Sequence, residues 1–283
     1  MKQTLHLRLE QLEDRCTPTT FGNPWPDASH LTLSFPADGT QIGPYQNQLS
    51  KLLNVQVSSN SAAWQRTILR AFQTWAVNAN VNLTVVADGG QPFGTGGAPQ
   101  GDARFGDVRV GAYPLASGGE LAFEEPFDAA AGTWAGDLSF SSSISYNPNQ
   151  AGSYDLFSVA LHEAGHVFGL DHSTDPNSPM YESYGGVRTG LTPGDIANFQ
   201  ALYGSRQPDS LEGSQGNNTF ATATPIVVLD GLNLSCTQAD VTTLNDKDFF
   251  KLSPLASIGS FSVQLQTTGI SSALLRLSVY KSR

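Results

Sequence analysis

Apolar residues change their spacing along this chain, and each change predicts a different kind of element. Between residues 61 and 78, Trp64, Ile68, Phe72 and Trp75 recur every three or four positions. At this spacing the side chains share one face of a helix. The sequence therefore predicts an amphipathic helix over this stretch.

Two further segments carry helix signals. One runs from about residue 153 to residue 168, and the other opens at the Thr192-Pro193 pair and stops before Gly204. Short apolar or alternating runs between Gly- and Pro-rich turns predict strands. These strands are residues 31–35, 81–86, 106–113, 119–123 and 136–146.

Local composition and hydrophobic periodicity divide the chain into four parts. Residues 1–27 form a leader or propeptide-like segment, and residues 28–204 hold the helices and strands named above. Residues 205–217 are polar and rich in turn-forming residues, as expected of a linker. Residues 218–283 show short β-rich runs without helical periodicity, which predicts a small all-β module.

Composition narrows the functional classes. With 15 Lys plus Arg against 25 Asp plus Glu, the formal net charge is −10, and 14% of residues are charged. Few basic residues make a poor phosphate binder, so nucleic acid and anionic membranes are not expected partners. No apolar run approaches the roughly 18 residues that would span a bilayer. The two cysteines, Cys16 and Cys236, do not make a disulfide framework.

Three of the five histidines are clustered in the segment HEAGHVFGLDH. His162 and His166 lie one helical turn apart, so both imidazoles can bind one metal ion. Gly169 permits the positive φ that ends a helix, and the reversal can return His172 as a third ligand. Three imidazoles with an open fourth position are typical of a catalytic zinc. Such a zinc lowers the pKa of its water to about 7, and Glu163 is placed to act as general base.

These residues match the signature HExxHxxGxxH of the metzincin metallopeptidases at every defined position. Met180, eight residues beyond His172 in SPMYESY, resembles the methionine turn beneath the metzincin metal site. Purely structural histidines are the alternative, and the combination of signature and methionine turn argues against it.

Within the metzincins, the chain resembles the matrixins from Ala28 to Gly204. The segments LTLSFPADGT, AFQTWA, FGDVRVGA and LTPGDIANFQALYG resemble matrixin segments in matrixin order. The resemblance implies an α+β zincin domain with a twisted mixed sheet, three helices and a shallow cleft above the zinc. It also implies an endopeptidase that binds extended peptides along an edge strand.

The same resemblance implies residues that contact the substrate. Leu121 and Ala122 match the edge strand. Tyr184 matches a wall of the S1′ pocket, and Ser158 would face its floor, where a small residue leaves the pocket deep. For Tyr184 and Ser158, an ordinary surface or core role is an equal alternative.

The chain departs from the matrixin pattern at a second metal site. Phe123 and Ser139 stand where matrixins commonly carry histidines of a structural zinc. No histidine lies between His30 and His162. One catalytic zinc is therefore expected, without the histidine-built structural one.

Carboxylates offer a different possibility, because calcium prefers oxygen ligands. Asp107, Asp137 and Glu120 are candidate calcium ligands, although surface carboxylates are usually solvated without a metal. Matrixins also carry an Asp pair on the last helix. Here its first position is Gly194, and only Asp195 remains to steady the methionine turn.

Both ends of the chain carry fainter resemblances. Cys16, in EDRCTP, resembles the latency motif of matrixin propeptides, in which a thiolate caps the zinc; an incidental cysteine is the alternative. The leader also resembles a short leader of exported bacterial proteins. The segments NNTFATATPI, NDKDFFKL and LLRLSVY resemble prepeptidase C-terminal domains of secreted bacterial peptidases, about two strands short of a complete module. An incomplete β sandwich is expected there, with Cys236 buried as a small apolar residue.

Two functional hypotheses follow. The first is a secreted zinc endopeptidase that hydrolyses extracellular proteins or peptides with Glu163 as general base. The alternative is a catalytically inert extracellular binding or adhesion protein on a metzincin scaffold. An intact Glu163 favours the enzyme.

Overall fold

The computed structural model describes residues 21–115, 120–208, 211–213, 215–226, 247–252 and 278–280. The expectations for Cys16, for Cys236 and for most of the predicted leader and C-terminal module lie outside these residues.

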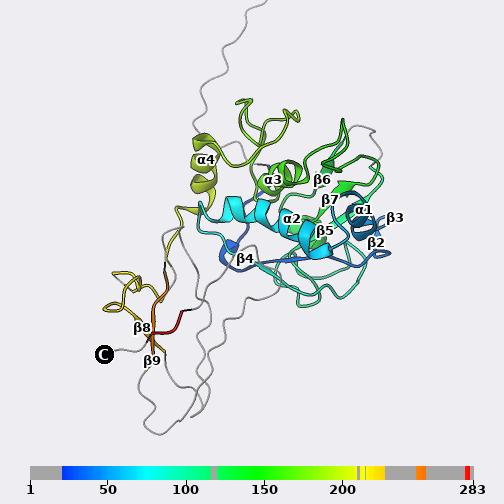
Figure 1. Ribbon diagram of the computed structural model, residues 1–283. Helices are drawn as coiled ribbons and strands as arrows, with labels where there is room; N and C mark the ends of the chain where they lie inside the picture. The colour runs from blue at the N-terminus through cyan, green and yellow to red at the C-terminus, as the bar shows by residue number, and fades with distance from the viewer. Residues whose placement is uncertain are drawn as a thin grey trace, which may run out of the picture.

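A five-stranded mixed sheet forms the centre of the main domain (Figure 1). Its strand order is β4-β1-β5-β7-β6. The bounds are β1 Leu31–Ser34, β4 Leu83–Val85, β5 Val108–Tyr113, β6 Ala122–Glu124 and β7 Leu138–Ser141. The first four strands in this order run parallel, and β6 is antiparallel to β7. The expected mixed sheet is confirmed, with β6 as one of its two edge strands.

Four α-helices accompany the sheet in the described part of the chain. They are α1 Leu49–Gln56, α2 Ser61–Ala76, α3 Leu156–Val167 and α4 Pro193–Tyr203. The smaller elements are the 3-10 turns η1 Ala28–His30 and η2 Ala129–Trp134, the hairpin of β2 Gln41–Ile42 and β3 Tyr45–Gln46, and the parallel pair of β8 Thr224–Ile226 and β9 Phe250–Leu252. None of these helices is long and apolar enough to cross a membrane.

The helix α1 differs from the expectation of three helices. Its N-cap residue, Gln48, makes no capping hydrogen bond through its side chain. Instead, the carboxylate of Asp38 accepts hydrogen bonds from the backbone N–H groups of Ser50 and Lys51, at 2.9 and 2.8 Å. Oδ1 of Asn47, the residue before the N-cap, also accepts a hydrogen bond from the backbone N–H of Leu49 at 3.1 Å, so two side chains that precede α1 in the chain hold its first turn.

The core lies between the sheet and the helices α2 and α3. Trp64, Phe72 and Trp75 of the predicted apolar stripe are fully buried. The indole Nε1 of Trp75 donates a hydrogen bond to the carbonyl oxygen of Leu161, at 2.9 Å. This bond ties α2 to α3 in the middle of the core. It thereby holds in place the helix that carries the histidines.

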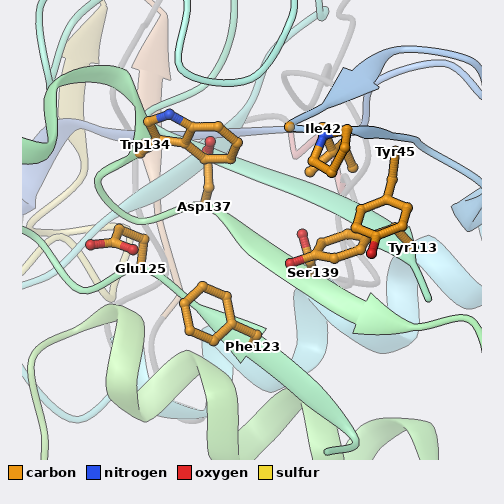
Figure 2. A pocket seen from close by; sticks show the side chains of 10 residues that line it. Ile42, Tyr45, Tyr113, Phe123, Glu125, Trp134, Asp137 and Ser139 are labelled. Carbon is orange, nitrogen blue, oxygen red and sulfur yellow. The ribbon is translucent and has the colours of Figure 1, made fainter. Parts of the chain in front are cut away.

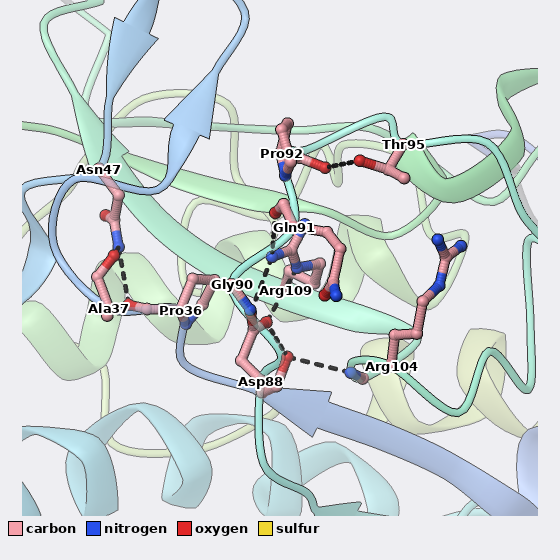
Figure 3. Close-up of polar contacts among 12 residues, drawn as sticks. Pro36, Ala37, Asn47, Asp88, Gly90, Gln91, Pro92, Thr95, Arg104 and Arg109 are labelled. Atoms are coloured by element: carbon pink, nitrogen blue, oxygen red, sulfur yellow. Dashed lines mark hydrogen bonds and ion pairs between the residues drawn. The ribbon is translucent and has the colours of Figure 1, made fainter.

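A buried ion pair fixes the long loop between β4 and β5 (Figure 3). Arg109 Nη2 and Asp88 Oδ1 are 2.8 Å apart, and Arg109 Nε donates to Asp88 Oδ2 at 2.9 Å. The guanidinium also lies over the rings of Phe93 and Phe105, 4.3 and 4.5 Å from their centroids. Both charged side chains are almost fully buried, so each depends on the other for its stability in the folded protein.

Candidate metal centre and cleft

The helix α3 brings His162 and His166 together. Its N-terminus is capped by Asp155, whose carboxylate accepts a hydrogen bond from the backbone N–H of Ser158 at 2.8 Å. One helical turn separates the two histidines, and their Nε2 atoms are 3.1 Å apart. At this distance both nitrogens can bind the same metal ion.

Backbone carbonyls fix the orientation of both rings. Nδ1 of His162 lies 2.7 Å from the carbonyl oxygen of Pro179, and Nδ1 of His166 lies 2.7 Å from that of Leu170. With Nδ1–H donating to these carbonyls, each Nε2 keeps its lone pair for a metal ion.

Gly169 ends the helix and turns the chain back toward the two histidines. Its φ is +91°, a conformation that residues with a Cβ rarely adopt. The ring of His172 then lies 4.8 Å from the ring of His166 and 5.3 Å from that of His162, measured between centroids. One nitrogen of each of the three histidines lies within 4.8 Å of the others. The third ligand predicted from the sequence is therefore placed with the first two.

The chemistry of this cluster fits a zinc ion. Metal binding needs neutral imidazoles, and burial lowers the pKa of His162 and lowers that of His166 to about 3. Three nitrogen ligands suit the tetrahedral preference of zinc and leave one position open. In the described part of the chain, this is the only group of three or more His, Cys, Asp or Glu side chains close enough to share an ion.

Met180 lies directly beneath the cluster. It is 2% exposed, and a Cβ on Gly165 of α3 would lie only 2.2 Å from its Sδ atom. The turn is held from α4: Ser178 Oγ accepts from the backbone N–H of Met180 at 2.9 Å and donates to Asp195 Oδ1 at 2.5 Å. Asp195 thus contacts the methionine turn through Ser178.

Glu163 is buried beside the histidines and is hydrogen-bonded to a second carboxyl group, that of Glu124 in β6. Burial raises the pKa of both residues, and that of Glu163 lies well above its usual range. Burial and the neighbouring carboxyl group of Glu124 both favour the neutral form of Glu163. Glu124 was not predicted from the sequence. The alternation of β6 could have found it, because Glu124 lies on the same face of the strand as Ala122.

A cleft of about 620 Å³ opens above the histidines. All four residues expected to contact substrate line it: Leu121, Ala122, Ser158 and Tyr184. Tyr184 accepts a hydrogen bond from the backbone N–H of Asp155 at 3.0 Å. Ser158 is buried, and its Oγ donates to Asp155 at 2.6 Å and accepts from the backbone N–H of Arg188 at 2.7 Å. Ser158 therefore also links α3 to the far wall of the cleft.

The candidate calcium ligands do not come together. Asp107 accepts hydrogen bonds from Thr32 and from the backbone N–H of Gly101, Glu120 lines the cleft, and Asp137 lines a different cavity. The expectation of calcium gains no support from this arrangement.

The helix α3 carries two histidines, and a glycine turn after it returns a third histidine to the same site. This arrangement defines a zincin-type metalloprotein. The sequence model of the matrixin family matches residues 46–204, and the chain belongs to this family. The histidine triad is the zinc-binding set typical of matrixins.

Curated relatives agree with this assignment. The chain is 30% identical to human neutrophil collagenase over 194 residues, which are 65% of this chain and 34% of the collagenase. It is 32% identical to pig interstitial collagenase over 210 residues, 69% of this chain and 36% of that protein. It is 38% identical to cat matrilysin over 94 residues, 29% of this chain and 36% of matrilysin. The chain thus spans about a third of the length of these relatives.

Proposed function

We propose that this protein is a zinc endopeptidase that hydrolyses peptide bonds in proteins or peptides. The observation that carries the proposal is the convergence of three histidine side chains and one buried carboxyl group at the floor of an open cleft. Histidines alone would serve a structural metal. The adjacent Glu163 supplies what hydrolysis also needs, a group that can move a proton.

Each residue of the site has a separate task. His162 and His166 would hold zinc through their Nε2 atoms and His172 through a ring nitrogen, and the ion would supply Lewis acidity for the scissile carbonyl and an acidified water. Glu163 takes a proton from the attacking water at its carboxylate and gives a proton to the leaving amine. Its burial favours proton uptake from the water, because desolvation raises the pKa of this carboxyl group.

The edge strand β6 is proposed to align the substrate. It ends the sheet, so its outer edge pairs with no other described strand, and an extended peptide can add there by main-chain hydrogen bonds. The opposite edge is held firmly, because Leu121 O accepts from Ser141 N at 2.9 Å and from the hydroxyl of Tyr146 at 2.5 Å. Tyr184 and Ser158 would form the wall and floor that receive the side chain after the scissile bond.

Glu163→Gln tests the mechanism. The variant should bind one zinc per chain, as measured by elemental analysis, and should lose about 10²–10⁴-fold in turnover of a broad fluorogenic peptide library. Asp128→Asn is the matched control, because Asp128 is exposed, caps η2, and asparagine caps equally well. Wild-type turnover in Glu163→Gln would overturn the proposed base. An inactive zinc-loaded wild type would instead favour the inert binding protein.

The remaining parts of the chain extend the proposal. We infer that the protein acts outside the cell, with residues 1–27 as a leader, 28–204 as the peptidase domain, 205–217 as a linker and 218–283 as a partial prepeptidase C-terminal-like β module. Two of the relatives are named as collagenases; for this chain we propose the broader class of protein and peptide substrates.

A further inference from the structure

A second, smaller cavity of about 100 Å³ lies where β5, β6 and β7 meet the β2–β3 hairpin (Figure 2). It is on the face of the sheet turned away from α3, because Phe123 and Ser139, which line it, alternate with residues that face the helix. At these two positions matrixins commonly carry histidines of a structural zinc, and this chain has Phe123 and Ser139 instead. The cavity that they border here therefore has a different chemistry.

Four aromatic side chains line this cavity: Tyr45, Tyr113, Phe123 and Trp134. The rings of Tyr45 and Tyr113 stack at 5.1 Å between centroids, with 16° between their planes. Trp134 comes from η2 and stands across the cavity from them (Figure 2). Phe123 completes the rim and is 47% exposed. Faces of aromatic rings attract cations through their quadrupoles.

Asp137 is a buried carboxyl group among these rings. It is 4% exposed, and its Oδ1 accepts a hydrogen bond from the backbone N–H of Arg109 at 3.2 Å. Its Oδ2 atom is buried and has no hydrogen-bond partner among the described residues. Burial raises the pKa of Asp137 well above its usual range. Burying an ionised carboxylate without a hydrogen-bond partner destabilises the folded protein. The unsatisfied Oδ2 atom of Asp137 therefore indicates a missing partner.

The neighbouring cation compensates the burial of this carboxyl group only in part: the charge of Arg109 lowers the pKa of Asp137, but the effect of burial is larger. The guanidinium of Arg109 is bound to the carboxylate of Asp88 and to the carbonyl oxygen of Gln91 (Figure 3). No ion pair joins Arg109 to Asp137 within the described residues. The residues that line the cavity include a second carboxylate, Glu125, and no lysine, arginine or histidine.

We propose that this cavity binds an organic cation, an alkylammonium or guanidinium head group, with Asp137 as its counter-ion and the tyrosine and tryptophan rings as its walls. An inorganic divalent ion fits less well, because calcium takes six to eight oxygen ligands, whereas this cavity is lined by two carboxyl groups together with four aromatic side chains. The proposal uses only residues of this cavity and does not rest on the proposed peptidase activity.

Titration of the full-length, zinc-loaded protein with n-butylammonium and guanidinium chlorides, followed by calorimetry and by the indole N–H signals in ¹H–¹⁵N spectra, tests the proposal. The signal of Trp134 is assigned by its loss in Trp134→Phe. We expect saturable binding that shifts this signal, and no binding of n-butanol, which has a similar shape without the charge. Asp137→Asn should weaken binding about tenfold or more, since it replaces a charged partner by a neutral one.

Asp175→Asn is the matched control, because Asp175 is exposed and lies outside the cavity; it should bind like wild type. Equal binding of butanol, unchanged affinity in Asp137→Asn, or no binding to wild type would each overturn the proposal. So would calcium binding that shifts the Trp134 signal while both organic cations leave it unmoved. If Asp137→Asn does not fold, the comparison of the three ligands and calcium on the wild type still decides.

Discussion

Gly165 is the position where a single added methyl group tests the packing beneath the metal centre. It lies in α3 between Glu163 and His166, and a Cβ there would be 2.2 Å from Met180 Sδ, 2.9 Å from Met180 Cε and 3.0 Å from Trp75 Cζ2. Real Cβ atoms do not approach heavy atoms so closely. Gly165→Ala therefore forces Met180, which is 2% exposed, to move.

Two opposing contributions set the size of the effect. Replacing glycine by alanine inside a helix gains about 1 kcal/mol. Forcing an extra methyl group into a packed core costs about 1–3 kcal/mol. Gly165→Ala should therefore lower the free energy of unfolding by up to about 2 kcal/mol. A displaced Met180 also shifts its neighbour Pro179, whose carbonyl oxygen orients His162, so zinc affinity should fall about tenfold or more.

Gly194→Ala provides the same chemical change in a helix with room for it. A Cβ on Gly194 in α4 meets only Thr192 Oγ1, at 3.6 Å. This variant should gain about 0.4–1 kcal/mol and bind zinc like wild type. In a Met180→Ala background the two closest contacts are gone and only Trp75 Cζ2, at 3.0 Å, stays close, so Gly165→Ala should then cost much less stability; the coupling in this cycle is expected at about 1–3 kcal/mol.

Urea unfolding of the zinc-free proteins measures the stabilities, and competition with a chromophoric chelator measures zinc affinity. The reasoning would be refuted if Gly165→Ala and Gly194→Ala stabilised the protein equally with zinc affinity unchanged. It would also be refuted if the effect of Gly165→Ala were the same with and without Met180.

Three further predictions concern other buried polar groups. Asp195→Ala removes the acceptor of Ser178 Oγ and part of the α4 capping box, and should cost about 1–2 kcal/mol in urea unfolding; an unchanged midpoint would contradict this. Arg109→Met leaves Asp88 buried without its partner and should cost about 3–5 kcal/mol, most of it recovered when Asp88 is also made apolar; equal stability of the single and double variants would argue against the pair. Because burial raises the pKa of Asp137 in the folded protein above its usual 3.8, protonated Asp137 is tolerated at low pH and its ionisation destabilises the fold as pH rises. Without an added cation, Asp137→Asn should therefore gain stability relative to wild type between pH 4 and pH 8, and a pH-independent difference would refute the sign.

The sequence by itself determined the metal centre. His162 and His166 are one helical turn apart, and Gly169 allows the reversal that returns His172. All of this is local geometry within one helix and one turn, which follows from the fixed rise and twist of an α-helix. The helices α2, α3 and α4 and all five strands of the sheet were also predictable, because the apolar periodicity of each element lies within one contiguous stretch of residues.

Only the tertiary structure decided the contacts between residues far apart in the chain. The pairing of Glu124 with Glu163 and the burial of Asp137 beside Arg109 each depend on how strands far apart in the chain are brought together. The alternation of β6 indicates which face of the strand Glu124 occupies, but no sequence pattern shows that Glu163 lies opposite it. The chemistry of each carboxyl group is set by burial and by its neighbours, and these exist only once the sheet is assembled.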